Sequence, residues 1–304
     1  MNNYDVIIVG GGAAGLTAAL VLLRARRSVA VVDSGAPRNA PAAHMHGYLS
    51  REGMAPSALL SRGRAEITDY GATLIDGEVV DIAPGFTARL SDGTALTARI
   101  ILISTGLSDE VPLVPGVSER WGRDVLHCPY CHGYEVQDEP IGVLGGTPDA
   151  VAHALLLRQW SDDVVHFSHT DTLTAEQEEA LAARGVTTIP GAVARLVVED
   201  DRLRGVELVN GTVVPRSAVF VRPRLIPNGG LLISLGCEMD ERGWVRHDAA
   251  GRTSRPGVYV AGNAADPRAQ VITAAGQGSA AAIAINTDLV EEEIAHALAT
   301  SRAR

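Results

Sequence analysis

Two cysteines separated by two residues are the residues best suited to chemistry in this chain. Cys128-Pro-Tyr-Cys131 is flanked by His127 and His132. Cysteines at this spacing can close a small disulfide ring and exchange it, because one thiolate attacks while the other resolves the mixed disulfide. A neighbouring imidazole can accept the proton of an incoming thiol. The motif predicts thiol–disulfide chemistry at Cys128 and Cys131.

Two other uses of the same motif rank lower. Cys-x-x-Cys-His contains zinc-ligand types, but a zinc site needs further ligands, and the one remaining cysteine is Cys237, between Leu-Gly and Glu-Met. The pattern also matches the attachment site of c-type haem, which requires export and a haem-binding fold. We see a sequence signal for neither, so no metal is expected. Cys237 is interpreted as a small buried hydrophobic residue.

A glycine motif near the start of the chain indicates a dinucleotide site. Gly10-x-Gly12-x-x-Gly15 follows the apolar run 4–9, which reads as a buried parallel strand, and opens the helical segment 16–23. Gly10 permits a tight turn, Gly12 lets the backbone approach a pyrophosphate, and Gly15 lets helix and strand pack closely. The helix N-terminus then offers N–H groups to the phosphates.

An acidic residue and two later segments refine this prediction. Asp33 ends the next strand, 28–33, and can accept hydrogen bonds from ribose hydroxyls, whereas a 2′-phosphate would be repelled there. The motif alone does not separate FAD from NAD. Val-Tyr-Val-Ala-Gly262-Asn263 favours FAD, because flavoproteins of the disulfide reductase class carry Gly-Asp at this place, and Ser104-Thr105-Gly106 resembles another strand end of that class.

A second strand–turn–helix–strand unit follows the cysteines, over 141–146, 150–160 and 164–167. Pro112–Gly116 reads as a hinge before it, and a small-residue helix is expected from about 272 to 289. The predicted fold class is α/β with two Rossmann-like domains, the second inserted into the first. The expected bounds are 1–113 and 243–304 for the FAD-binding domain, and 114–242 for the degenerate NAD(P)H-binding-like domain that carries the cysteines.

Composition excludes several classes of protein. The chain has 304 residues, a formal net charge of −10 and 4% aromatic residues, which disfavours nucleic acid and anionic membrane as partners. All 26 basic residues are arginine, so no lysine nucleophile exists. We find no signal peptide and no apolar run of membrane-spanning length. Three cysteines do not form a secreted disulfide framework, and a cytoplasmic location is expected.

Together these motifs resemble the low-molecular-weight thioredoxin reductase family over nearly the whole chain. The stretch from Pro267 to Gly276 fits the family segment beside the flavin. The finer match differs, because Cys-Pro-Tyr-Cys-His-Gly-Tyr-Glu over 128–135 is similar to the dithiol oxidases that close disulfides in gliotoxin, holomycin and romidepsin. His132 stands where the reductases keep an acidic residue. Ala-Pro-Arg-Asn over 36–39 also resembles the oxidases.

The resemblance implies an FAD enzyme that oxidises a small natural-product dithiol, passes the electrons to O₂ and forms H₂O₂, as a homodimer. It implies that substrate attacks Cys128, that Cys131 lies nearer the flavin, and that His132 shuttles protons with support from His127 and Glu135. His46, His44, His153, His166 and His169 have structural or surface roles by default, but the resemblance adds His46 to the flavin candidates. These candidates are Gly10, Gly12, Ala13, Ala14, Gly15, Asp33, Ser34, Arg38, Asn39, His46, Val80, Thr105, Gly106, Gly262, Asn263, Gln270 and Val271.

The second glycine turn predicts weak binding of NADPH. Thr147 replaces the second motif glycine, Asp149 would repel phosphate, and no arginine follows the strand in Phe167-Ser-His-Thr170. Losing two charge-assisted contacts at roughly 1.5–3 kcal/mol each weakens binding by several powers of ten. NADPH is therefore not an expected cofactor. Two alternatives stay open: an NAD(P)H-dependent disulfide reductase, and a flavin-containing redox sensor without turnover.

Overall fold

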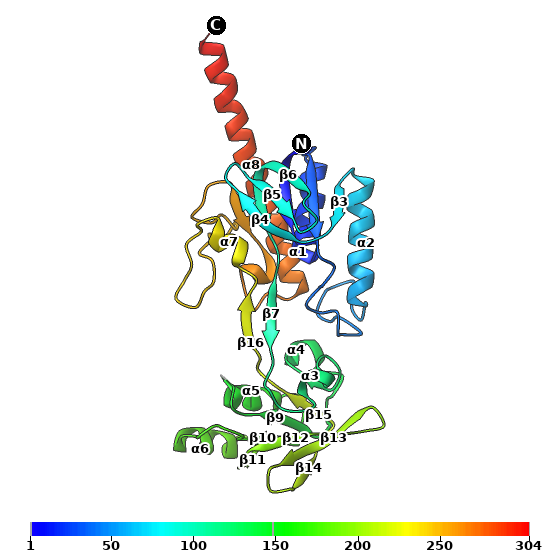
Figure 1. The fold of residues 1–304 in the computed structure, drawn as a ribbon. Helices are drawn as coiled ribbons and strands as arrows, with labels where there is room; N and C mark the ends of the chain where they lie inside the picture. The colour runs from blue at the N-terminus through cyan, green and yellow to red at the C-terminus, as the bar shows by residue number, and fades with distance from the viewer. Residues whose placement is uncertain (1, 148, 304) are drawn as a thin grey trace. The chain divides into compact units, whose positions relative to one another are not determined.

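The computed structural model describes residues 2–147 and 149–303, so Pro148 of the second glycine turn lies outside the described residues. The chain forms two compact units (Figure 1). Unit 1 comprises Met1–Ala40, Ala55–Ser108 and Pro227–Arg304, and unit 2 comprises Pro41–Met54 and Asp109–Ile226. The second unit is thus inserted into the first, and the predicted fold class is confirmed.

The observed bounds differ from the expected breaks at 113/114 and 242/243. The chain crosses between units in β7 (Leu107–Glu110) and β16 (Arg224–Pro227), which pair as a two-stranded sheet. Pro112–Gly116, the expected hinge, belongs to unit 2, where the backbone of Gly116 packs against Leu196. Residues 227–242 belong to unit 1, because Leu232 and Cys237 are buried in its core. The limits of the two units are therefore decided by which hydrophobic core each segment enters, and the local sequence pattern does not show this.

The sheet of unit 1 has the order β3-β2-β1-β6-β5-β4, with β17 pairing to β6. Strands β3, β2, β1, β6 and β17 pair in parallel, and β4, β5 and β6 are antiparallel. The elements of this unit are β1 (Asn2–Val9), α1 (Ala13–Arg24), β2 (Val29–Asp33), α2 (Pro56–Asp69), β3 (Thr73–Asp76), β4 (Val79–Ala83), β5 (Thr87–Leu90), β6 (Ala95–Ile103), α7 (Gly230–Ser234), β17 (Val258–Val260), the 3-10 turn η1 (Gly262–Ala264) and α8 (Val271–Arg302).

Strand β1 shows why this sheet is buried on both faces. Val6 and Ile8 pack in one core cluster with α1 and α8, whereas Ile7 and Val9 pack in another with β4, β5 and α7. Side chains alternate between the faces of a strand, so a continuous apolar run serves both cores. Helix α8 continues to Arg302, beyond the end near residue 289 that small-residue composition predicted.

Unit 2 is built on a five-stranded parallel sheet with the order β11-β10-β9-β15-β8, and β8 is an edge strand. A three-stranded antiparallel sheet, β12-β13-β14, packs in the same unit. The elements are α3 (Val117–Arg120), β8 (Val125–Leu126), α4 (Pro129–His132), β9 (Ile141–Leu144), α5 (Ala150–Leu157), β10 (Val164–Phe167), α6 (Ala175–Ala183), β11 (Thr187–Ile189), β12 (Val193–Glu199), β13 (Arg202–Leu208), β14 (Val213–Pro215) and β15 (Ala218–Phe220). The predicted second strand–turn–helix–strand unit is thus present as β9, α5 and β10.

Candidate active site

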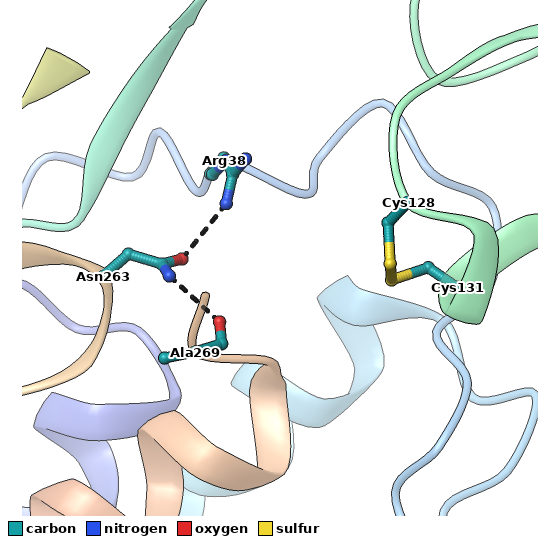
Figure 2. Close-up of a disulfide and its surroundings, with 5 residues drawn as sticks. All are labelled: Arg38, Cys128, Cys131, Asn263 and Ala269. Carbon is teal, nitrogen blue, oxygen red and sulfur yellow. Dashed lines mark hydrogen bonds between the residues drawn. A yellow bond between two sulfur atoms is a disulfide. The ribbon is translucent and has the colours of Figure 1, made fainter. Parts of the chain in front are cut away.

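Cys128 and Cys131 follow the carboxyl end of β8 and form a disulfide (Figure 2). Cys128 precedes the short helix α4, whose first residue is Pro129, and its carbonyl accepts hydrogen bonds from the backbone N–H groups of Cys131 and His132, both at 3.1 Å. The two Cα atoms are 5.2 Å apart, within the range that a disulfide spans. This tight turn brings together the sulfur pair that the spacing predicted.

The imidazole of His132 is suited to accept a proton. Burial lowers its pKa below the ordinary value, Glu135 opposes the shift, and His46 adds to it. Its Nδ1 atom is buried and has no hydrogen-bond partner within residues 2–147 and 149–303. Because the neutral form predominates at neutral pH, His132 can act as a base next to Cys131.

His127, on the other side of the sulfur pair, packs against a buried histidine. Its ring lies 6.5 Å from that of His153 in α5, and His153 meets Phe220 edge-on at 5.7 Å. Burial, with contributions from Arg222 and His127, lowers the pKa of His153 to about 3. His153 is therefore a neutral packing residue behind His127, in agreement with its default structural role.

His46, a flavin candidate by resemblance, lies in the 41–54 segment of unit 2. Its Nδ1 atom is 2.6 Å from Oε1 of Glu52, and its Nε2 atom is 3.3 Å from Oε1 of Glu135. Two candidates of different expected roles, His46 and Glu135, are thus in contact. Sequence reasoning missed Glu52, because its partner is identified only by the loop's fold.

The first glycine turn has the close approaches that its motif predicts. Gly10 has a φ of +108°, and a Cβ there would lie 2.4 Å from the carbonyl oxygen of Ser104. A Cβ on Gly15 would lie 1.9 Å from the carbonyl oxygen of Gly10, so only glycine fits. A Cβ on Gly12 would meet no described atom within 4 Å, which leaves that face of the turn open for a ligand. Helix α1 begins directly afterwards, at Ala13.

Asp33 is held in place by the same turn. Its Oδ1 atom accepts a hydrogen bond from the backbone N–H of Gly11 at 3.0 Å, and its Oδ2 atom lies 3.3 Å from Arg64 of α2. A carboxylate has further lone pairs, so ribose hydroxyls can still be accepted. Arg64 was missed, because nothing in its local sequence indicates a contact with Asp33.

Asn263 uses its side chain to order the loop before α8 (Figure 2). Its Nδ2 atom donates to the carbonyl oxygens of Asp266 at 3.0 Å and Ala269 at 2.9 Å, and its Oδ1 atom accepts from Arg38 at 3.4 Å. An aspartate could not make the two donated bonds. Asn263 therefore shapes this loop directly, in addition to its expected role toward the flavin.

Hydrogen bonds with Asn228 hold the strand end at Thr105 and Gly106 in place. The Thr105 hydroxyl donates to the Asn228 carbonyl at 2.9 Å, and the Asn228 side chain donates to the Thr105 carbonyl at 2.9 Å. The Asn228 N–H donates to the Gly106 carbonyl at 3.1 Å. Asn228 was missed, because it lies over one hundred positions away in the chain.

The other flavin candidates are also distributed over unit 1. Ala14 is buried beneath α8, where a Cβ on Gly278 would lie 2.1 Å from the Ala14 carbonyl oxygen, and Gly262 donates its N–H to Oε1 of Gln277 at 2.9 Å. Gly278 and Gln277 were missed by sequence reasoning. Ser34 and Val80 are exposed, Asn39 is half-buried, Gln270 is the N-cap of α8, and Val271 is its first residue.

The second glycine turn borders a cavity whose lining includes carboxylates. A cavity of about 410 Å³ beside α5 is lined by Thr147, Asp149, Asp171 and Glu176, and no arginine of the described residues lines it. The Nη2 atom of Arg222 lies 3.4 Å from the Oδ2 atom of Asp149 and partly balances the charge of that carboxylate. The Nδ1 atom of His169 accepts a hydrogen bond from the N–H of Val193 at 3.0 Å, so this imidazole has a structural role.

The residues of unit 1 fit FAD. The open face at Gly12, the N-terminus of α1 and the positioned carboxylate of Asp33 provide groups for a pyrophosphate and a ribose. Within the described part of the chain, no cluster of three or more His, Cys, Asp or Glu residues could hold a metal ion. In the same residues, no helix is both long and apolar enough to cross a membrane. Cys237 is buried as predicted, and burial raises the pKa of its thiol.

The chain belongs to the pyridine nucleotide-disulphide oxidoreductase family, whose model matches residues 4–278 and whose members bind FAD. It is 29% identical to thioredoxin reductase sirT of Leptosphaeria maculans over 96% of each chain. It is 31% identical to the thioredoxin reductase of Treponema pallidum, over 92% of this chain and 95% of that one. The crystal structure of HlmI matches with a TM-score of 0.97 and 59% identity, over 99% of this chain and 96% of HlmI.

The thioredoxin reductase of Streptococcus pyogenes MGAS5005 matches with a TM-score of 0.86 and 27% identity, over 95% of this chain and 99% of that one. The resemblance to thioredoxin-reductase-like dithiol oxidases, drawn from the motifs, is confirmed by these comparisons.

Proposed function

We propose that this protein oxidises a small natural-product dithiol to an intramolecular disulfide and passes the electrons to O₂. The proposal depends above all on one observation, the carboxylate-lined cavity at the second glycine turn. A nucleotide carrying several phosphates is repelled by Asp149, Asp171 and Glu176. Electrons then have to enter through the Cys128–Cys131 disulfide, from thiols.

The proposed reaction begins with attack of a substrate thiolate on the Sγ atom of Cys128. The S–S bond of the protein breaks, and the Sγ atom of Cys131 leaves as a thiolate. His132 takes the proton of the second substrate thiol, whose sulfur then attacks the first substrate sulfur and releases the Sγ atom of Cys128. The substrate leaves as a disulfide, and the two cysteines hold its two electrons.

FAD, held by unit 1, would supply two-electron acceptor chemistry, with O₂ as the final oxidant and H₂O₂ as its product. Overall, one dithiol and one O₂ give one disulfide and one H₂O₂, so two electrons and two protons are transferred. The open backbone at Gly12 and the carboxylate of Asp33 are the groups of unit 1 that would hold this cofactor.

The test compares three cysteine variants under air with dithiothreitol as a surrogate dithiol. Cys128→Ser and Cys131→Ser are expected to retain bound flavin and lose steady-state O₂ consumption. Cys237→Ser is the matched control, because this thiol is buried in the core of unit 1, and it should turn over like the wild type. Full turnover by either of the first two variants would refute the proposed mechanism.

Two measurements on the wild-type protein distinguish the proposed oxidase from the two alternative functions. An NAD(P)H-dependent disulfide reductase would lose its flavin absorbance rapidly when mixed anaerobically with micromolar NADPH or NADH. A redox sensor would be reduced once by dithiothreitol, two electrons for each disulfide, and would then consume no further O₂. Our proposal requires slow or absent bleaching by the nucleotides together with continuous O₂ uptake.

We also propose a homodimer. Helix α8 exposes Ile283, Val290, Ile294 and Leu298, which lie on one helical face at spacings of seven and four residues. An exposed apolar stripe of this kind marks an interaction surface. Light scattering should give twice the 31.8 kDa chain mass, and Ile294→Glu should lower it to the monomer value.

A further inference from the structure

The loop over 41–54 is flanked on both sides by unit 1 in sequence but packs as part of unit 2. Two contacts hold it there. Pro41 lies against the backbone of Gly122, where an added Cβ would come within 2.7 Å of the Cβ of Pro41. The Nε2 atom of His46 lies 3.3 Å from Oε1 of Glu135. The first part of the loop is therefore attached to unit 2 at both of its ends.

The two attachment points lie on either side of the disulfide in sequence. Gly122 precedes Cys128 by six residues, and Glu135 follows Cys131 by four residues. The loop advances five residues between its two contacts, which even a fully extended chain covers in at most about 18 Å. The start of the loop thus runs beside the segment of unit 2 that carries both sulfur atoms.

Backbone hydrogen bonds close the rest of the loop on itself. Met45 N–H donates to the Met54 carbonyl at 2.9 Å, and Gly53 N–H donates to the Met45 carbonyl at 3.1 Å. At the tip, Arg51 N–H donates to the Tyr48 carbonyl at 2.8 Å. The side chain of Met45 is buried beneath this closure. A loop with internal hydrogen bonds and a buried side chain keeps its shape better than an open one.

Glu52 connects the closed part of the loop to its attachment on unit 2. Its Oε2 atom accepts the N–H of Gly47 at 2.9 Å, and its Oε1 atom lies 2.6 Å from Nδ1 of His46. The same imidazole contacts Glu135 through its other ring nitrogen. Loss of the Glu52 carboxylate would therefore loosen the loop and its attachment together.

We propose that the loop over 41–54 forms a fixed side of the approach to the Cys128–Cys131 disulfide, and that it selects small dithiols over dithiols carried on folded proteins. Glu52 is then a positioning residue that acts through the loop. The inference deepens the proposed function and rests on it only for the entry of electrons from thiols at Cys128.

The physical reason is the difference in size between the two kinds of substrate. A protein that presents a dithiol has to bring a surface on the order of several hundred Å² against its target. A rigid loop that runs beside the cysteine segment obstructs such a surface. A small dithiol needs only the space around the attacked sulfur atom. Specificity of this kind comes from a clash with the unwanted partner, and the clash requires that the loop does not yield.

The test measures thiol–disulfide exchange in the absence of O₂. Oxidised protein is mixed with dithiothreitol or with reduced thioredoxin and quenched with iodoacetamide. The electrons taken up are counted as reduced flavin, by absorbance, and as alkylated Cys128 and Cys131, by mass spectrometry. The rate constant with thioredoxin divided by the rate constant with dithiothreitol measures the selectivity.

Two variants and one control are compared with the wild type. Glu52→Ala is expected to raise this ratio at least about tenfold, with the dithiothreitol rate constant within about twofold of the wild type. Replacement of residues 48–51 by two glycines shortens the tip and should raise the ratio as well. Arg51→Ala is the matched control: within the described residues, its side chain donates to the neighbouring Ser50 carbonyl at 3.1 Å and bridges no part of the loop, so the ratio should not change.

Flavin content and the thermal midpoint are measured first, and a variant that keeps both decides the outcome. An unchanged ratio in Glu52→Ala or in the shortened loop would overturn the inference. So would an equal rise of both rate constants, or a raised ratio in Arg51→Ala. The exchange assay needs no oxidase turnover. If the wild type consumes no O₂ with dithiothreitol, the proposed function fails while the ratio still tests the loop; if it consumes O₂ and the ratio does not move, only the inference fails.

Discussion

Replacing His153 by leucine should remove part of the sensitivity of unit 2 to acid. His153 is 2% exposed, and its pKa falls from 6.5 in the unfolded chain to about 3 in the folded protein. Between pH 6.5 and about pH 3, His153 is protonated in the unfolded state and neutral in the folded state. Stability is therefore full above pH 6.5 and decreases as the pH falls through this window.

The size of the effect follows from the two pKa values. Each pH unit below 6.5 lowers the free energy of unfolding by about 1.4 kcal/mol. At pH 5, His153 alone therefore lowers the free energy of unfolding of the wild type by roughly 2 kcal/mol. His166 is also buried with a lowered pKa, but it contributes to wild type and variant alike and cancels in their difference. His153→Leu should therefore narrow the stability difference between pH 7.5 and pH 5 by roughly 2 kcal/mol.

The assay is urea unfolding at the two pH values, followed by tryptophan fluorescence in a Trp244→Phe background. Trp121 and Trp160 then report on unit 2, because Trp244 is the tryptophan of unit 1. His296→Leu, at an exposed position of α8, is the control for removing a histidine and should leave the pH dependence unchanged. If His153→Leu loses as much stability on acidification as the wild type, the buried neutral histidine is not a source of the acid sensitivity.

Three further predictions concern packing and recognition. Gly278→Ala places a Cβ 2.1 Å from the Ala14 carbonyl oxygen, so α8 must shift away from α1. Thermal unfolding should show a loss of about 1–3 kcal/mol of stability, and the purified variant should contain less flavin. Normal flavin content with unchanged stability would contradict the close packing. Asn263→Asp removes two donated hydrogen bonds at about 1 kcal/mol each and should lower the thermal midpoint, whereas a stabilised variant would show that the loop is not ordered by this side chain. Tyr130 is 65% exposed between the cysteines and meets the ring of Trp160 at 5.6 Å, so Tyr130→Ala should raise KM for apolar dithiols several-fold more than for dithiothreitol; equal changes would argue against an aromatic contact with substrate.

Local sequence was a good guide wherever the chemistry is built from neighbouring residues. The strand, glycine turn and helix around Gly10 and Gly15 were predicted because the same few residues make the turn and need its backbone conformation. The Cys128–Cys131 pair was predicted because one short helix spans it. The end of α8 was predicted too early, since small residues stop near 289 while the helix continues through charged residues to Arg302.

Contacts between distant segments could not be predicted in the same way. The Arg64–Asp33 and Asn228–Thr105 contacts join residues 31 and 123 positions apart, and no periodicity or motif marks them. The domain limits were displaced for a related reason, because Leu232 and Cys237 are assigned to unit 1 by the core that they enter.

The sequence by itself determined the class of chemistry: a sulfur pair with adjacent imidazoles, and a turn that fits a dinucleotide. Only the tertiary structure decided that a further imidazole lies between two carboxylates, since the loop over 41–54 brings His46 and Glu52 to Glu135 across more than eighty positions of chain. Hydrogen bonds and charges act over a few ångströms in space. Their partners are therefore chosen by folding, while turn geometry and thiol spacing are properties of adjacent residues.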